Sequence, residues 1–163
     1  MGIVNDLASS ASVPWLVIAK KAVPMVGKLL EKIPDRDFGF VSAFERFGSE
    51  FELQTEIDRL HAKFGYVLVY DCHSIRSVVP RFFEGTLPDL NLGTADNSSA
   101  APDLVSKLGD VLEGGRHSYI VNGRFKGGYI TRHYGAPDRH IHAVQMEIAQ
   151  SAYMEESHPF AYD

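Results

Sequence analysis

The chain has 163 residues, of which 45% are hydrophobic and 23% charged, and this is the composition of an ordinary globular domain. Its formal net charge of −5 comes without a dense block of Lys and Arg, so we expect no nucleic-acid partner. The single cysteine, Cys72, excludes an internal disulfide and fits a reducing cytoplasm. An apolar run near the N-terminus is interrupted at Lys20 and Pro24, well short of the roughly 20 residues that span a bilayer. We therefore expect a cytoplasmic protein without a membrane partner.

The first fifty residues are predicted to form a divergent helical segment of a single domain, 1–163. Ser12 can cap a helix over 13–32, although Pro24 would kink or break it. A second, short helix that ends near Gly48 is predicted from the spacing of Phe40, Ala43, Phe44 and Phe47.

From residue 51 onwards the pattern alternates between helices and strands. Apolar residues recur every three or four positions over 51–64, which predicts an amphipathic helix. The β-favouring run 66–70 follows at once and is typical of a strand that is buried on both faces. A helix that leads into such a strand indicates α/β architecture, with 51–163 as its main part.

A long irregular stretch precedes the remaining elements. Residues 76–101 are rich in Pro, Gly, Asn, Asp and Ser, and we expect them to border the functional site, because loops of this length are usually functional or mobile. A second amphipathic helix is predicted from Pro102 to the glycine pair at 114–115. Strands are then predicted over 117–121 and 127–132, with an Asn-Gly turn between them, and 141–149 is predicted to be a further strand or a strand-to-helix junction.

Two polar residues follow the first buried strand. Asp71 and His73 come at its carboxyl end, where open α/β sheets place their ligands. His73 can give one imidazole nitrogen to zinc while Asp71 holds the other N–H and fixes the tautomer. The alternative is a histidine that is satisfied by backbone groups at a strand end, and an isolated Asp-x-His favours this alternative.

Glu147 lies within the apolar run 144–148, where a carboxylate is rarely found without a partner. Burial would raise its pKa and suit it to act as a general base towards a metal-bound water. An ion pair with a nearby arginine is an equal alternative.

Further candidates would bind an acidic substrate or surround the metal. Four arginines flank the apolar elements: Arg76, Arg81, Arg124 and Arg132. Because a guanidinium binds a carboxylate at two points, we expect one or two of them to bind substrate and the others to be solvated. The spacing of His133 and His142 matches no helical histidine pair. We expect them to contact the metal ligands and not to bind the metal themselves.

Four blocks of this sequence, in this order, resemble the N-formylglutamate amidohydrolase family: 71–81 (DCHSIRSVVPR), 87–94 (LPDLNLGT), 122–135 (NGRFKGGYITRHYG) and 142–147 (HAVQME). The resemblance runs from about Leu53 to Glu156. It implies a zinc-peptidase-like, three-layer α/β fold with a mixed sheet. It also implies hydrolysis of N-formyl-L-glutamate, a small acidic metabolite, to formate and L-glutamate in histidine degradation.

The resemblance also implies roles for single residues. His73 would be a zinc ligand and Glu147 the catalytic carboxylate, which helps to deprotonate the water that zinc activates for attack on the formyl carbonyl. The carboxylates of the substrate would be held by Arg76, Asn122 and Arg132.

The sequence departs from the family pattern near its N-terminus. The family's first metal motif is Ser-x-Pro-His-x-Gly, and the nearest trace here is Ser12-Val13-Pro14-Trp15, whose tryptophan cannot bind zinc. Asp37 is the candidate for the acidic ligand. The family's terminal helix would fall beyond Asp163, so we expect an incomplete version of the fold.

Two hypotheses therefore stand beside a working zinc deformylase. One is a truncated, inactive relative, in which uncovered sheet edges and apolar faces would favour self-association. The other is a non-catalytic module that binds acidic metabolites or a partner chain.

Overall fold

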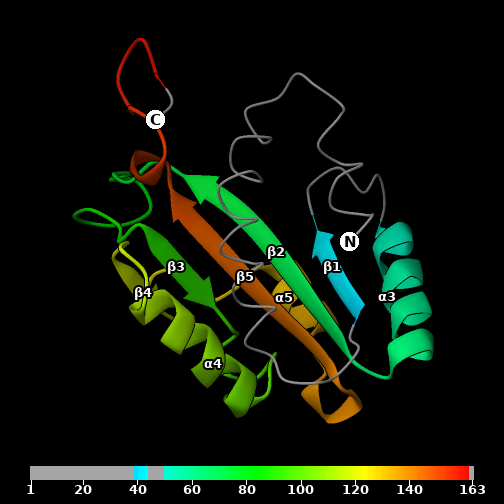
Figure 1. The fold of residues 1–163 in the computed structure, drawn as a ribbon. Helices are drawn as coiled ribbons and strands as arrows, with labels where there is room; N and C mark the ends of the chain where they lie inside the picture. Colours follow the sequence, from blue (N-terminus) through cyan, green and yellow to red (C-terminus); the bar gives the residue numbers. More distant parts are fainter. Residues whose placement is uncertain (1–38, 44–49, 162–163) are drawn as a thin grey trace. The chain divides into compact units, whose positions relative to one another are not determined.

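The computed structural model describes residues 39–43 and 50–161, all of which belong to a compact unit that spans Asp35–Asp163 (Figure 1). The predicted helix over 13–32, the tryptophan Trp15 and the candidate ligand Asp37 lie outside the described residues. None of the helices within 50–161 is long and apolar enough to cross a bilayer.

A mixed sheet forms the centre of this unit, and its strands are arranged in the order β1-β2-β5-β3-β4. β1 (Gly39–Ala43), β2 (Val67–Ile75) and β5 (Ile141–Ala149) run parallel to one another. β3 (Leu90–Gly93) runs antiparallel to β5 and parallel to β4 (Tyr119–Val121). Short 3-10 helices precede and follow β5, at Pro137–Arg139 (η1) and Gln150–Ala152 (η2).

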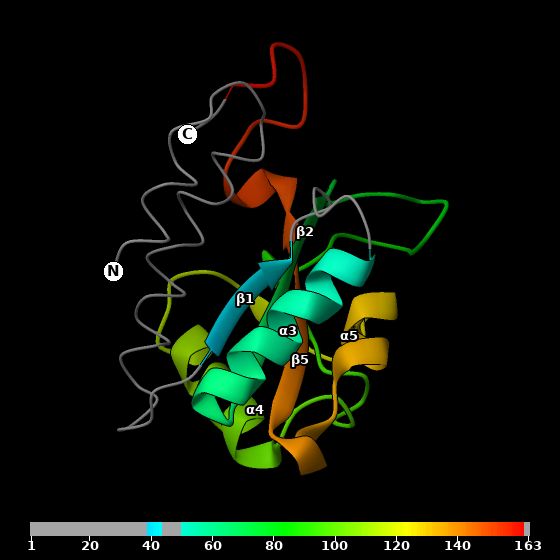
Figure 2. The ribbon, with the colours of Figure 1, turned by 90° about the vertical axis from the view of Figure 1, so that its right-hand side faces the viewer.

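Helices cover both faces of the sheet (Figure 2). α3 (Glu50–Phe64) and the short α5 (Tyr129–Tyr134) pack on one face, in a core with strands β2 and β5. α4 (Pro102–Glu113) lies on the opposite face. The three-layer α/β fold with a mixed sheet is therefore confirmed.

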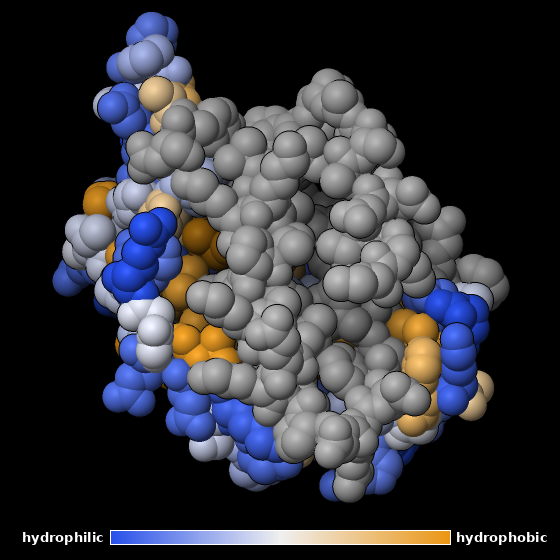
Figure 3. Space-filling model, viewed as in Figure 1, coloured by the Kyte–Doolittle hydropathy of each residue, from blue (hydrophilic) through white to orange (hydrophobic). Residues whose placement is uncertain are grey.

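The two helices that the sequence predicts over 51–64 and after Pro102 bury the expected stripes. Leu53, Ile57 and Leu60 of α3 contact Val67, Val69, Ile141 and Ala143 of the sheet. On α4 the buried side chains are Leu104, Leu108 and Leu112. Figure 3 shows hydrophilic residues along the outer side of α4, as expected for an amphipathic helix with one face on the sheet.

Three predicted features of the secondary structure are wrong. Residues 39–43 form a strand where Phe40 was expected to begin a helix, because pairing with β2 outweighs the local spacing of aromatic residues. Residues 129–134 form α5 rather than the second strand of a hairpin. The expected irregular stretch 76–101 contains β3, whose two partner strands are distant in sequence.

The Asn-Gly turn at Asn122 is present, but a helix follows it and not the expected strand. Asn122 has a left-handed φ of 51° and Gly127 a φ of 109°. Between them the chain leaves the sheet edge and passes over the end of β3. There a Cβ on Gly93 would overlap the Gly127 nitrogen and lie 2.6 Å from the Lys126 carbonyl carbon. The loop 122–128 therefore packs backbone to backbone on Gly93.

This close approach predicts opposite effects for two glycine substitutions. Gly93→Ala is expected to lower the free energy of unfolding by about 1–3 kcal/mol, because backbone atoms must move to admit the methyl group. Gly109→Ala, in the interior of α4 with open space around its Cβ position, should raise it by about 0.5–1 kcal/mol. Urea denaturation of both variants measures the two changes, and equal stabilities would contradict the packing described.

Candidate functional site

A polar layer lies between two apolar clusters on the α3–α5 face of the sheet. Side chains alternate along a strand, so Asp71 and His73 of β2 and Gln145 and Glu147 of β5 share this face. On the side of the N-terminal strand ends lies the core with α3. On the other side a smaller cluster is formed by Phe83, Leu87 and Ala149, with Ile75, Val79 and Phe125 packed against it.

The polar layer is assembled by the register of the two central strands. β2 and β5 pair in parallel with Asp71 opposite Gln145 and His73 opposite Glu147. Every residue of β5 is buried. The side chains of Asp71 and Glu147 are therefore held inside the protein at adjacent positions in the layer.

Asp71 holds the ring of His73. Nε2 of His73 lies 2.7 Å from Oδ1 of Asp71, and Asp71 is only 3% exposed while His73 is partly exposed. This is the carboxylate–imidazole contact that the sequence predicts. With the carboxylate at Nε2, Nδ1 would be the coordinating atom if His73 binds a metal.

Glu147 is held by a neighbour that the sequence analysis did not nominate. Nε2 of Gln145 donates to Oε2 of Glu147 at 3.1 Å, while the Gly128 N–H donates to Oε1 of Gln145 at 2.5 Å. From the β3 side, the Asn91 amide donates to the backbone carbonyl of Glu147 at 3.2 Å. The sequence feature that could have identified Gln145 is its spacing of two residues from Glu147, because residues two apart on a strand lie on the same face of the sheet.

Cys72 lies between Asp71 and His73 but faces the other side of the sheet. Burial, together with the smaller effect of the negative charges of Asp71 and Glu147, raises the pKa of Cys72 to about 12. The thiol therefore stays protonated at neutral pH and is not a nucleophile. This agrees with a cysteine that packs as a small apolar residue.

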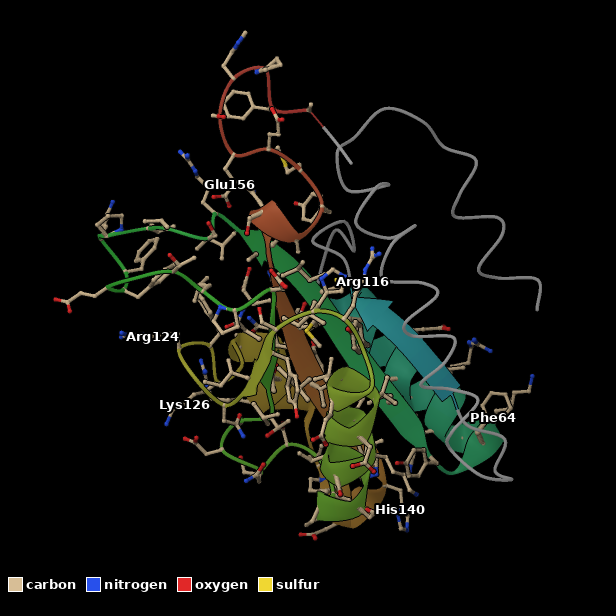
Figure 4. All side chains as sticks on the ribbon, turned by 60° about the vertical axis from the view of Figure 1, so that its left-hand side comes forward. Phe64, Arg116, Arg124, Lys126, His140 and Glu156 are labelled. Atoms are coloured by element: carbon tan, nitrogen blue, oxygen red, sulfur yellow. The ribbon has the colours of Figure 1, made fainter. Side chains whose placement is uncertain are left out.

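Arg76 directly follows β2, at the point where Glu156 of the C-terminal segment contacts the end of this strand. Its Nη2 donates to the Glu156 carbonyl oxygen at 2.9 Å. The Glu156 carboxylate in turn accepts the Ser77 N–H at 2.5 Å and the Ser77 hydroxyl at 2.6 Å. Figure 4 shows Glu156 beside the loop that follows β2. Arg76 is exposed at the strand end nearest to the polar layer, which is compatible with its predicted role towards substrate.

Asn122 lies at the start of the loop 122–128 that leads to α5, and Arg132 lies within α5. Oδ1 of Asn122 accepts the Thr94 N–H at 2.8 Å, and its Nδ2 donates to Oγ1 of Thr94 at 2.8 Å. This amide braces the two loops in the structure, and its substrate-binding role stays a prediction. Nη1 of the exposed Arg132 donates to the Gly127 carbonyl at 2.5 Å.

The remaining predicted histidines lie away from the polar layer or at the surface. His133 is exposed and stacks on Tyr129, with ring centroids 4.8 Å apart. His142 is buried on the α4 side, where its Nδ1 accepts the Ala101 N–H at 3.1 Å. It precedes Glu147 by five residues, or about 16 Å of strand, and faces the opposite side. The structure thus places His142 apart from His73, contrary to its expected role behind the metal.

His140 and Glu156 mark the two ends of β5 in Figure 4, and the polar layer lies towards Glu156. His142 belongs to the His140 end. Its ring lies 4.6 Å from that of Tyr66, centroid to centroid. The five-residue spacing on one strand is what separates His142 from Glu147.

The buried His142 predicts a pH dependence of stability. Burial lowers the pKa of His142. The negative charge of Asp103 raises this pKa by a smaller amount, and the nearby His140 lowers it. The native state therefore keeps the ring neutral, whereas the unfolded chain takes up a proton below about pH 6.5. The free energy of unfolding should fall as the pH drops from about 6.5 towards the lowered pKa.

His142→Asn keeps an acceptor for the Ala101 N–H and removes the titration. Urea denaturation between pH 7.5 and pH 5, with pH steps of roughly half a unit, should give a shallower decline for this variant than for the unchanged chain. The matched control is His133→Asn at an exposed ring, which should leave the slope as it was. Parallel curves for all three proteins would show that His142 is not the group responsible.

The donor set of the polar layer does not complete a zinc site. Catalytic zinc usually takes three protein ligands, and the layer offers one imidazole, on His73, backed by Asp71. Within 39–43 and 50–161, no cluster of three or more His, Cys, Asp or Glu residues could hold a metal ion.

Comparisons with known proteins agree on one family. A family model described as N-formylglutamate amidohydrolase matches residues 51–154. An N-formylglutamate deformylase of Pseudomonas putida is 57% identical over 111 residues, which are 68% of this chain and 42% of that protein. A deformylase of the same name from Pseudomonas aeruginosa is 56% identical over 108 residues, 66% of this chain and 41% of that protein.

A solved structure gives the same result. The N-formylglutamate amidohydrolase of Ralstonia eutropha JMP134 superimposes with a TM-score of 0.59 at 25% identity, over 65% of this chain and 40% of that chain. The chain thus spans about two-fifths of the length of the relatives it matches. The matched residues include the whole polar layer.

Proposed function

Because the chain belongs to the N-formylglutamate amidohydrolase family, we propose that it hydrolyses N-formyl-L-glutamate to formate and L-glutamate. The observation that carries the proposal is the pairing of His73 with Glu147 on adjacent buried strands, inside the matched segment. Because the matched segment covers only about two-fifths of the curated relatives, their named activity is a proposal for this chain. Its place in histidine degradation and in the cytoplasm belongs to the same proposal.

Glu147 would carry the proton transfers. Hydrolysis of an amide needs a base that takes a proton from the attacking water and an acid that gives one to the leaving amine. A buried carboxylate that is held by a hydrogen bond can do both in turn. Glu147 is only 6% exposed and accepts the Gln145 amide, so its position is defined before substrate arrives.

The substrate would be recognised by its two carboxylates. Arg76 and Arg132 are exposed, and each donates a hydrogen bond to a backbone carbonyl, from Nη2 and Nη1 respectively. A guanidinium has five N–H donors, so these bonds leave further donors for a carboxylate. Asn122 completes the proposed set, provided that its amide can turn from Thr94 to substrate.

Zinc is the proposed cofactor, with His73 as its ligand among the described residues. When bound, zinc would supply a Lewis acid for the carbonyl oxygen and for water. The described residues do not complete its coordination. The other ligands would have to come from beyond the described ranges, such as Asp37, or from a partner chain.

The decisive experiment combines metal analysis with formate release from N-formyl-L-glutamate. We expect turnover with bound zinc, and a loss of at least about 100-fold in kcat for Glu147→Gln, which cannot accept the proton. Glu113→Gln, at the exposed end of α4, is the matched control and should keep full turnover. Removal of the metal with a chelator should abolish turnover, and added zinc should restore it.

The incomplete ligand set favours a second candidate, which is an inactive relative or a module that binds acidic metabolites. Absence of both zinc and formate at high protein concentration would refute the hydrolase. Binding of L-glutamate under those conditions, measured by calorimetry, would then support the binding module.

A further inference from the structure

Gln145 connects the catalytic carboxylate proposed above to the backbone at the start of α5. We propose that it is a positioning residue, which fixes the orientation of the Glu147 carboxylate by holding it to the Gly128 N–H. This inference rests on the proposed function, because it assigns a task to a neighbour of Glu147. The two hydrogen bonds of the Gln145 amide carry it.

The direction of the Gln145 amide is determined by its partners. The Gly128 N–H is a donor, so it can meet only the carbonyl oxygen of the amide, at 2.5 Å. The amide nitrogen then faces Glu147, whose Oε2 accepts from it at 3.1 Å. Reversing the amide would place two donors together at Gly128 and two acceptors together at Glu147. One orientation is therefore strongly favoured.

The bridge lies in the interior. Gln145 and Glu147 are each only 6% exposed, so water cannot readily replace a lost hydrogen bond. Asn91 restrains Glu147 as well, but it binds the backbone carbonyl and not the carboxylate. Gln145 thus restrains the side chain of Glu147, whereas the strand pairing and Asn91 restrain its backbone.

The other end of the bridge is also restrained. Gly127 packs on Gly93, and its carbonyl accepts from Arg132. A Cβ on Gly128 would lie 3.1 Å from Oε1 of Gln145, so there is little space between the loop and the amide. The bridge therefore links the carboxylate of Glu147 to the loop 122–128, which also accepts a hydrogen bond from Arg132 of α5, the proposed substrate-binding residue.

The first test measures the bridge without reference to activity. Nuclear magnetic resonance of the full chain should show slow hydrogen exchange and a downfield proton shift at the Gly128 amide, and both should be lost in Gln145→Met. Glu147→Gln should shift the side-chain NH₂ resonances of Gln145. A Gly128 amide that exchanges freely in the unchanged chain would overturn the inference even if Gln145→Met fails to fold.

The second test measures the consequence for the reaction. A hydrogen bond to a charged group is worth about 1.5–3 kcal/mol, so Gln145→Met should lower kcat by roughly 10- to 100-fold. KM should change less than about twofold, because the proposed substrate contacts lie elsewhere. An unchanged kcat in a folded variant, or a loss confined to KM, would refute the positioning role.

The matched control removes a glutamine–carboxylate bond far from the polar layer. Nε2 of Gln54 donates to Oδ1 of Asp58 at 2.8 Å on the exposed side of α3. Gln54→Met should leave kcat and the Gly128 resonance unchanged. If the unchanged chain releases no formate, the proposed function fails, and the resonance experiment alone decides whether Gln145 holds Glu147.

Discussion

The parallel pairing of β2 with β5 is the constraint on which the rest of the site depends. Shifting this pairing by one residue would turn Gln145 and Glu147 to the α4 side, away from Asp71 and His73. Because β5 and most of β2 are buried, such a slip would place the polar side chains of β5 in the apolar layer under α4, and this cost fixes the register. Hydrophobic packing around Val67, Val69 and Ala143 thereby determines which carboxylate lies beside which imidazole.

The elements that could be predicted from sequence are those whose pattern is local. α3 and α4 follow from apolar spacing, β2 follows from the β-favouring run 66–70, and β5 from the largely apolar stretch 141–149. β1, β3 and α5 could not be predicted in the same way, because their structure is decided by distant partners. β3 has only four residues and is held between β5 and β4, which are both far from it in sequence.

The same distinction between local patterns and distant partners applies to the candidate site. The Asp71–His73 contact is local, with two residues on one strand, and it was one of the two alternatives that the sequence left open. The burial of Glu147 was visible in its apolar neighbours. The contact of Gln145 with Gly128 depends on where the loop 122–128 passes, and nothing in the local pattern fixes that path. The alternation of side chains along 141–149 places His142 on the face opposite Glu147, which disagrees with the role expected for it beside the metal ligands.

The bonds between Glu156 and the end of β2 have a consequence for the order of folding. They join residues 79 and 80 positions apart, so they close one of the longest loops in the unit. Such contacts carry a large loop-closure cost and tend to form after local helices and their nearest packing partners. During synthesis the guanidinium of Arg76 must therefore wait for nearly eighty further residues before it reaches its final position. The substrate end of the polar layer would then be the last part of the unit to become ordered.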